Sequence, residues 1–280
     1  MKRNIDLAVI SDVHLGTYGC HAKELLQYMQ SIQPKRVILN GDIIDIWQFK
    51  KSYWPKEHML VIRHILKWVA EGVNVSYITG NHDEMMRKFV GFNLGSLEIV
   101  NKKVMHIDGK SFWIFHGDVF DVTMQYSKWL AKLGSVGYDF LILLNRAVNY
   151  FSVRMGKGKM SLSKKIKNGV KSAVKFINKF EETAADIAIH NGYDYVVCGH
   201  IHQPEMREIT TDKGKVQYLN SGDWIENLTC LEYNNGAWTI YNYNEDPIAQ
   251  NIKLDNTSST NKNDKELFTM LMEEFKMKVA

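Results

Sequence analysis

The sequence predicts an α/β fold built on a largely parallel sheet, and the order of its elements carries the prediction. Apolar runs at 5–10, 36–40 and 73–78 indicate buried strands. The segments between them, 21–32 and 55–70, have the pattern of helices. An order of β-α-β-α-β is typical of a parallel sheet whose faces are covered by helices.

Prolines and turn residues delimit these elements. Pro34 marks the end of the first helix, and Pro55 stands near the first turn of the second. Beyond the third strand the pattern changes to short strands joined by tight turns, at 108–110 and again at 234–237. In contrast, 122–190 lacks strand signals and is expected to be helical.

One large core interrupted by an insertion is the expected organisation of the 280 residues. The core would comprise 1–121 and 186–245, and the insertion would be a helical cap at 122–185. Residues 246–280 begin as a polar linker and are expected to end in a short helix.

Composition points to a globular protein of the cytoplasm. Apolar residues make up 45% of the chain and charged residues 24%, which is ordinary for a folded domain. The three cysteines are widely spaced and give no disulfide framework. No apolar run approaches the ~18 residues of a spanning helix, and the N-terminus lacks the pattern of a signal peptide. We therefore expect a cytoplasmic protein. Peripheral association with the inner membrane is compatible with this location.

Positive charge is concentrated in the insertion. Between Val122 and Phe180 there are twelve Lys or Arg and one acidic residue, Asp139, although the whole chain carries only +4. The segment 161–180 also has apolar residues at helical spacing, with lysines on the other faces. A basic amphipathic helix of this kind can lie on an anionic membrane, or it can pack its apolar face on a neighbouring helix.

Five polar clusters each follow a predicted strand. They are "DVH" at 12–14, "GDIID" at 41–45, "GNHD" at 80–83, "HGD" at 116–118 and "GHIH" at 199–202. Each cluster alone could be a turn or a helix cap. Together they form a pattern that chance does not explain, because the carboxyl ends of strands line the functional crevice of an open α/β sheet.

The residue types in these clusters suit two divalent cations. Carboxylate, amide and imidazole groups are all present, and no cysteine belongs to the set, which disfavours a structural zinc site. Such mixed ligands suit Mn²⁺, Fe²⁺ or Zn²⁺. Two adjacent ions can generate hydroxide near neutral pH and hold a phosphoryl group. Surface or packing roles are expected for the remaining five histidines, which are His21, His58, His64, His106 and His190.

The order D-x-H, G-D-x-x-D, G-N-H-D, H, G-H-x-H resembles that of the calcineurin-like metallophosphoesterases, in outline over residues 6–243. The resemblance implies a metallophosphoesterase two-sheet sandwich flanked by helices, with two metal ions at its top. The ligands of the first ion would be Asp12, His14, Asp42 and His202, and those of the second Asp42, Asn81, His116 and His200. His82 would act as general acid or phosphate contact, with Asp45 orienting it.

The basic cap between the last two ligand motifs is similar to that of the UDP-2,3-diacylglucosamine diphosphatases of lipid A biosynthesis. That similarity implies hydrolysis of an acylated nucleotide sugar to UMP and a diacylated glucosamine 1-phosphate, with Mn²⁺ as the metal, at an anionic membrane surface. Lys164, Lys167 and Lys171 of the cap would then contact the substrate. In those enzymes an arginine follows the Gly-Asn pair, and His82 takes that place here.

Three alternatives stay open from the residues alone. A soluble phosphodiester or phosphomonoester would need no acyl groove, and the apolar face of the cap would then serve packing only. A nuclease would use the positive charge to follow a phosphate backbone, but the residues interleaved with the lysines are mostly aliphatic rather than aromatic. A scaffold on the same fold would usually lack some ligands. We expect no nucleic acid among the partners.

Overall fold

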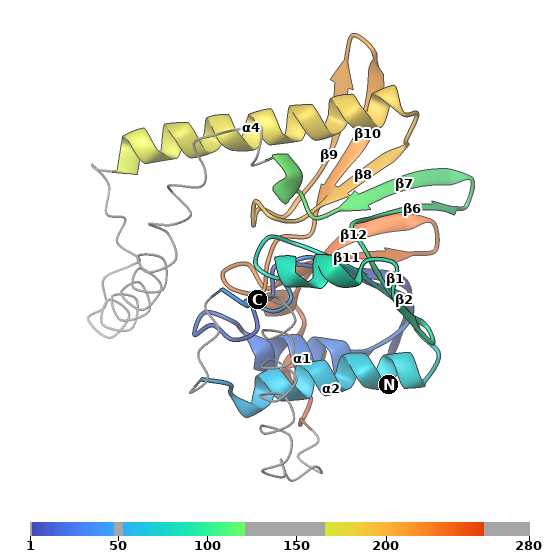
Figure 1. Ribbon diagram of the computed structural model, residues 1–280, viewed down its shortest axis with the longest axis vertical. Coiled ribbons are helices and arrows are strands. Elements are labelled where there is room, and N and C mark those ends of the chain that lie inside the picture. The colour runs from blue at the N-terminus through green and yellow to red at the C-terminus, as the bar shows by residue number, and fades with distance from the viewer. Residues whose placement is uncertain (1, 48–52, 121–165, 255–280) are drawn as a thin grey trace.

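The computed structural model of the protein describes residues 2–47, 53–120 and 166–254 of the chain. For 166–175 the backbone alone is described. Two sheets lie face to face, with helices on the outer face of each (Figure 1). This α-β-β-α sandwich is the fold class expected from the sequence.

The first sheet has seven strands, of which four neighbours run parallel. In spatial order the strands are β12 (Ala237–Asn242), β11 (Thr229–Asn234), β1 (Arg3–Ile10), β2 (Ile32–Asn40), β3 (Asn74–Ile78), β5 (Leu97–Val100) and β4 (Asn93–Leu94). The run β1, β2, β3, β5 is the parallel part predicted from the β-α-β-α-β order. Its carboxyl ends therefore lie along one edge of the sheet.

The second sheet has five strands. In spatial order they are β6 (Lys102–Ile107), β7 (Lys110–Phe115), β8 (Tyr195–Cys198), β10 (Gly214–Asn220) and β9 (Glu205–Thr211). The three central strands are parallel, and the two outer strands pair antiparallel with their neighbours. The tight turns expected at 108–110 and 234–237 are confirmed, because Asp108, Gly109, Asn235 and Gly236 all have positive φ.

Helices cover the outer faces of both sheets (Figure 1). The helices α1 (Ala22–Ser31) and α2 (Lys56–Ala70) lie against the first sheet, and α4 (Ile166–His190) lies along the second and projects beyond it. Short helices complete the chain: η1 (Glu84–Phe89), η2 (Asp118–Phe120), η3 (Tyr243–Glu245) and α5 (Pro247–Gln250). No described helix is both long enough and apolar enough to cross a membrane.

Successive side chains of the central strands point to opposite faces, so apolar residues form a core on each side of each sheet. On β1, Leu7 and Val9 face the second sheet, whereas Ala8 and Ile10 pack toward the helices. On β7, Phe112 belongs to the core between the sheets. Burial of one such large side chain contributes about 1.5–3 kcal/mol, so the sheets are held firmly and their loop ends share one rigid platform.

The structure contradicts the expectation that Pro34 follows a helix and precedes the next strand. The strand β2 begins at Ile32, and Pro34 lies inside it, opposite Ile5 of β1. The neighbouring strand β3 pairs only from Arg36 onward. At Pro34 one side of β2 is therefore an open edge, where the missing proline N–H is tolerated.

Helix α4 confirms helical structure over the last part of the predicted insertion, while 121–165 and the predicted tail helix lie outside the described residues. The helix continues through residue 185, where the insertion was expected to end. Phe180, Ala184 and Ala188 are fully buried against the second sheet.

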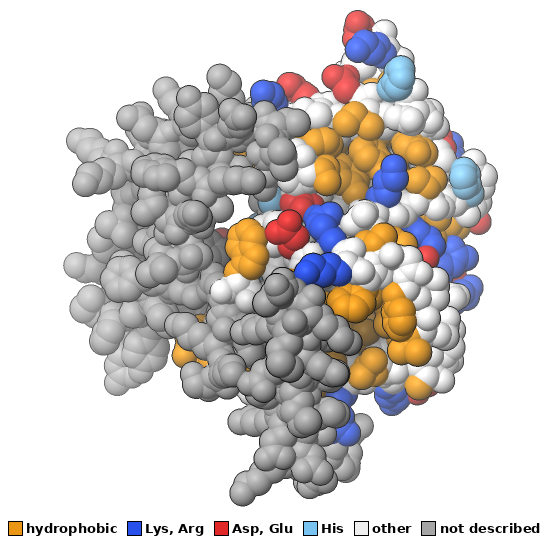
Figure 2. Space-filling view, viewed as in Figure 1, with side chains coloured by type: hydrophobic (Ala, Val, Ile, Leu, Met, Phe, Trp, Pro, Cys, Tyr) orange, Lys and Arg blue, Asp and Glu red, His pale blue; other side chains and the backbone are white. Residues whose placement is uncertain are grey.

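On the face shown in Figure 2, apolar side chains gather over the second sheet, and acidic and basic side chains lie side by side below them.

Candidate metal centre

The seven predicted ligands all lie in loops at the carboxyl ends of strands from both sheets. Asp12 and His14 follow β1, Asp42 follows β2, and Asn81 follows β3 in the first sheet. His116 follows β7, and His200 and His202 follow β8, in the second sheet. The sandwich thus brings together, at one edge, side chains that are as far apart in sequence as Asp12 and His202.

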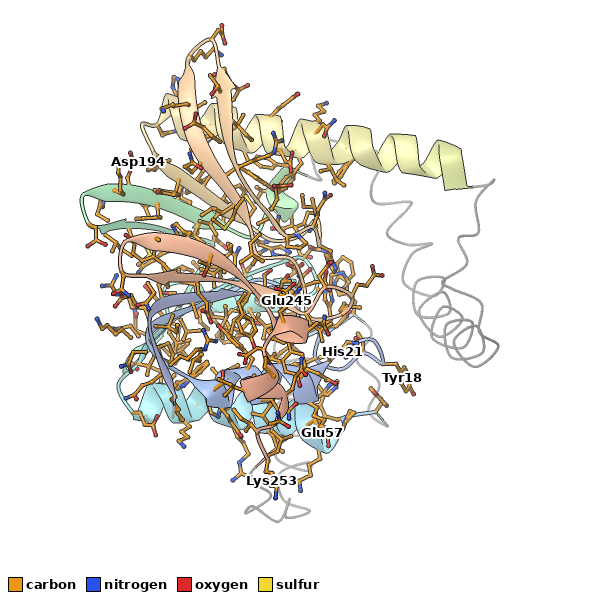
Figure 3. The ribbon with its side chains drawn as sticks, turned by 180° about the vertical axis from the view of Figure 1, so that it is seen from behind. Tyr18, His21, Glu57, Asp194, Glu245 and Lys253 are labelled. Carbon is orange, nitrogen blue, oxygen red and sulfur yellow. The ribbon has the colours of Figure 1, made fainter. Side chains whose placement is uncertain are left out.

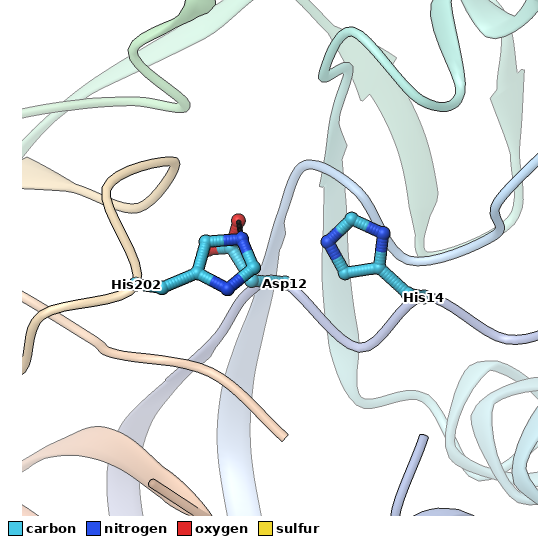
Figure 4. A group of neighbouring side chains, drawn as sticks. All are labelled: Asp12, His14 and His202. Atoms are coloured by element: carbon cyan, nitrogen blue, oxygen red, sulfur yellow. Dashed lines mark ion pairs between the residues drawn. The ribbon is translucent and has the colours of Figure 1, made fainter. Parts of the chain in front are cut away.

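Three of these residues form one group. A ligand atom from each of Asp12, His14 and His202 lies within 4.8 Å of the others. Nε2 of His202 is 3.2 Å from Oδ1 of Asp12, and the rings of His14 and His202 have centroids 5.3 Å apart. Figure 4 shows the His202 ring against the Asp12 carboxylate, with the His14 ring across from them.

A second group consists of Asp42, His116 and His200, again within 4.8 Å of one another. Nε2 of His116 is 3.2 Å from Oδ2 of Asp42. The same Oδ2 lies 3.9 Å from Nε2 of His14, which belongs to the first group. The Asp42 carboxylate therefore stands between the two groups, as a bridging ligand must.

Hydrogen bonds hold the Asp12 and Asp42 carboxylates and His116 in position. The backbone N–H of His82 donates to Oδ1 of Asp42 at 2.8 Å, and that of His200 donates to the Asp12 carboxylate at 3.1 Å. Nδ1 of His116 lies 2.8 Å from the carbonyl oxygen of Asn40, to which it must donate. This bond fixes the tautomer and leaves the Nε2 lone pair facing the site.

Three polar atoms at the site are buried without a hydrogen-bond partner among the described residues. They are Nε2 of His14, Nε2 of His116 and Oδ1 of Asn81. Buried polar atoms are normally satisfied, so each needs an explanation. Two ligands bound to one ion at about 2.1 Å and at right angles lie roughly 3 Å apart, which matches the spacing of His116 and Asp42. These donors fit divalent metal ions.

Backbone strain is concentrated at the same residues. Asp12, His14, Asp42, His200 and His202 all have φ between 52° and 69°, in the left-handed region. Only three other non-glycine residues in the described ranges have positive φ. Each such residue costs of order 1–3 kcal/mol, and strain of this kind persists where the surrounding structure enforces it. The loops therefore hold these five side chains inward at the expense of stability.

The charges of the site depend on one another. Burial favours a neutral Asp12, but the neighbouring His202 outweighs it and lowers the pKa of Asp12 to about 2. Burial likewise opposes a charged His202, yet Asp12 and then Asp223 raise the pKa of His202 to about 9. The pKa of Asp42 is held well below its ordinary value because His116 outweighs the effect of burial. The buried carboxylates thus require positive charge beside them, from protons or from metal ions.

His82 and Asp45 form a hydrogen-bonded pair beside the two groups. Nδ1 of His82 lies 2.9 Å from Oδ2 of Asp45, and Nδ1 of His14 lies 3.3 Å from the same oxygen. Burial lowers the pKa of His82, but the bond to Asp45 and the charge of Asp42 outweigh it, so the pKa is raised. One carboxylate therefore orients two imidazoles at once.

Three supporting residues were missed from the sequence. Asp223 lies 3.9 Å from Nδ1 of His202 and accepts backbone N–H groups of residues 225 and 226. Asp83 accepts the hydroxyl of Tyr77 and the N–H groups of residues 43 and 80, which ties two ligand loops together. Asn40 completes the set. Asp83 is the last residue of the "GNHD" cluster and Asp223 directly follows Gly222, and these positions near a glycine are the only signal that could have indicated them.

The predicted substrate residues of the cap fall largely outside the described part. Lys164 is not described, and Lys167 and Lys171 lie on α4 in the stretch where only the backbone is described. The same helix reaches the site further on, because the rings of Phe180 and His200 have centroids 6.3 Å apart. Helix α4 therefore connects the basic segment to the edge of the second ligand group.

Comparisons with known proteins identify the family of the chain. Residues 5–204 match the calcineurin-like phosphoesterase family. The UDP-2,3-diacylglucosamine hydrolase of Aliivibrio fischeri is 22% identical over 83% of this chain and 96% of its own, and that of Wigglesworthia glossinidia brevipalpis is 25% identical over 80% and 89%. A phosphoesterase of E. coli has 12% identity and a TM-score of 0.44 over 85% of this chain and 93% of its own. The chain belongs to the calcineurin-like phosphoesterase family and is a metal-dependent hydrolase of phosphoesters.

Proposed function

We propose that this enzyme hydrolyses the diphosphate of UDP-2,3-diacylglucosamine, releasing UMP and 2,3-diacylglucosamine 1-phosphate. The observation that carries the proposal is the extent of the similarity to enzymes of that name. The relative from Aliivibrio fischeri aligns over 96% of its own length and 83% of this chain, which supports a shared substrate. The acylated nucleotide sugar would be the partner of the site, and an anionic membrane its surroundings.

The proposed metal centre uses the two groups already described. Asp12, His14 and His202 would hold one ion, and Asn81, His116 and His200 the other, with Asp42 shared. Bound divalent ions, for which Mn²⁺ is our expectation, supply water activation and neutralise phosphoryl oxygens. Asp42 suits the shared position because its Oδ2 faces Nε2 atoms of both groups, at 3.2 Å and 3.9 Å.

His82 is the proposed general acid. Its Nδ1 is engaged by Asp45 at 2.9 Å, so its Nε2 is the atom that can deliver a proton. As water attacks phosphorus and the bond to the leaving oxygen breaks, His82 would donate to that oxygen. The bond to Asp45 raises the pKa of His82 against the effect of burial, which favours the protonated form that a general acid needs. Asp45 acts through His82 and is therefore a positioning residue.

The cap is proposed to bind the acyl chains and the lipid surface. Helix α4 projects beyond the second sheet (Figure 1), and its sequence places lysines around an apolar stripe. Acyl burial contributes about 0.8 kcal/mol per CH₂, so two chains could dominate the affinity. Lys164, Lys167 and Lys171 would attract the anionic substrate or the membrane.

The test compares three substrates with the metal-loaded enzyme: the diacylated UDP-sugar, UDP-N-acetylglucosamine and a simple aryl phosphodiester. We expect rapid UMP release from the acylated compound alone. The double variant Lys167→Gln/Lys171→Gln should raise its KM severalfold, whereas Lys213→Gln, an exposed lysine between β9 and β10, should not. Equal rates with the sugar that lacks acyl chains would refute the lipid substrate.

A soluble phosphoester is the second candidate, and His82 favours it. In the diphosphatases that this chain resembles, an arginine stands at this position, whereas histidine is common in the wider family. In this case the aryl phosphodiester would be the best of the three substrates, and the lysine variants would leave its KM unchanged.

A further inference from the structure

Trp47 is fastened to the loop that carries His82. The backbone N–H of Ile46 donates to the carbonyl oxygen of His82 at 3.0 Å, and the Asp45 carboxylate is bonded to the His82 ring. Two successive residues thus tie the end of the β2 loop to the β3 loop. The next residue, Trp47, is therefore fixed beside the imidazole that we propose as general acid.

The indole of Trp47 lies against that imidazole and is open to solvent. The ring centroids of Trp47 and His82 are 4.9 Å apart, with 36° between the planes. Trp47 is 54% exposed, whereas the five other tryptophans in the described ranges are at most 8% exposed. A single exposed aromatic residue is common on protein surfaces. That general frequency of exposed aromatic residues does not explain an indole that is in contact with the imidazole proposed as general acid.

We propose that Trp47 is a stacking platform for the planar base of a nucleotide whose phosphate lies at the metal centre. The inference rests on the proposed function for the presence of a nucleotide in the substrate. An indole presents a large flat π surface, and stacking of a base on such a ring changes affinity by about 5- to 150-fold. Trp47 would therefore set specificity for nucleotide diphosphates over other phosphoesters.

The experiment measures binding of UMP and of ribose 5-phosphate to the metal-loaded enzyme by calorimetry. The two ligands share the phosphate and the sugar and differ in the base. Wild-type enzyme should bind UMP at least fivefold more tightly. In Trp47→Ala this advantage should disappear, while the Kd of ribose 5-phosphate changes less than twofold. Trp47→Phe should retain most of the advantage because its ring can still stack.

Phe92 supplies the matched control. It is 49% exposed, and its backbone is bonded to Phe89 and Ile99 at the edge of the first sheet. Phe92→Ala should leave both dissociation constants unchanged. An equal loss of affinity for both ligands in Trp47→Ala would show that the indole only positions His82, and this would overturn the inference. So would equal affinities for UMP and ribose 5-phosphate in the wild-type enzyme.

Hydrolysis of the diacylated UDP-sugar, followed in the same variants, separates this inference from the proposed function. Hydrolysis without any Trp47-dependent preference for UMP would support the diacylated UDP-sugar as substrate and refute the stacking platform. A Trp47-dependent preference without hydrolysis of that sugar would support the platform and refute the substrate.

Discussion

Oδ2 of Asp42 lies 3.2 Å from Nε2 of His116, and Asn40 fixes the His116 tautomer in which that nitrogen is an acceptor. Two acceptors at this distance require a positive charge between them. A proton can supply it, and the pKa of His116 is indeed raised well above its ordinary value by Asp42, against the effect of burial. A divalent cation supplies it better, because it also satisfies the other carboxylates and imidazoles nearby.

Replacing His82 by alanine should reduce turnover without emptying the metal centre. A positioned general acid typically contributes about 10²–10⁴-fold to rate, so kcat should fall by that factor. The backbone N–H of His82 that holds Asp42 is retained in the variant. Metal content measured beside kcat decides the role, since loss of metal in His82→Ala would make His82 a ligand instead.

Asp45→Asn should weaken the enzyme through two histidines. The carboxylate accepts from Nδ1 of both His14 and His82, and loss of such a partner typically costs 10–100-fold in metal affinity or activity. Metal titration and kcat, measured together, should both change. Asp186→Asn, an exposed acid on α4, is the matched control. If kcat fell while metal affinity stayed unchanged, the contact between Asp45 and His14 would not support metal binding.

Gly41→Ala should damage the site by collision and not by backbone strain alone. Gly41 has φ +79°, and an added β-carbon would overlap the imidazole of His116. Gly72 has a similar φ of +84°, with nothing within 4 Å of the added carbon. Gly72→Ala should therefore lose only about 1–2 kcal/mol of stability, the cost of a left-handed alanine, and keep its activity. Similar activity losses in both variants would refute the collision.

Two histidines away from the site should make the fold sensitive to acid. Burial lowers the pKa of both His58 and His64 to about 4, from an ordinary 6.5. Between these pH values the unfolded chain binds protons that the native state excludes. The free energy of unfolding should therefore fall as pH drops from 6.5 to 4, by up to about 3 kcal/mol for each residue.

Urea unfolding at pH 4.5 and pH 7 measures this effect. His64→Gln should flatten the loss of stability because glutamine does not titrate. His190→Gln, at the exposed end of α4, is the control and should leave the pH dependence unchanged. An identical loss of stability in His64→Gln and the wild-type protein would contradict a neutral, buried His64.

The sequence predicted which polar residues gather at the strand ends, because each follows a strand and lies beside a glycine or another polar residue; their role as metal ligands stays a prediction. It could not predict the left-handed backbone of Asp12 or His200, since non-glycine residues adopt that conformation only where the surrounding structure enforces it. Tyr18 shows the same limit: it projects from the loop after β1 (Figure 3), which no periodicity indicates. The strand position of Pro34 was missed because it depends on where the neighbouring strand β3 begins, at Asn74, and that is a property of the sheet.

The partners of the ligands were also beyond the sequence. Asn40 and Asp223 carry no motif, and their roles follow from bonds to His116 and from proximity to His202. The two-sheet arrangement came from resemblance to a family and not from the β-α-β order, which is equally compatible with a single open sheet.

Metal content per chain tests the central claim most directly. Purified enzyme reconstituted with Mn²⁺ should hold two ions per chain by mass spectrometry. Asp42→Asn should lose at least one ion and its phosphoesterase activity, since asparagine tolerates the left-handed backbone there but cannot bridge two cations. Fewer than one ion per chain in the wild-type enzyme, or full metal content and activity in Asp42→Asn, would contradict a dinuclear centre bridged by Asp42.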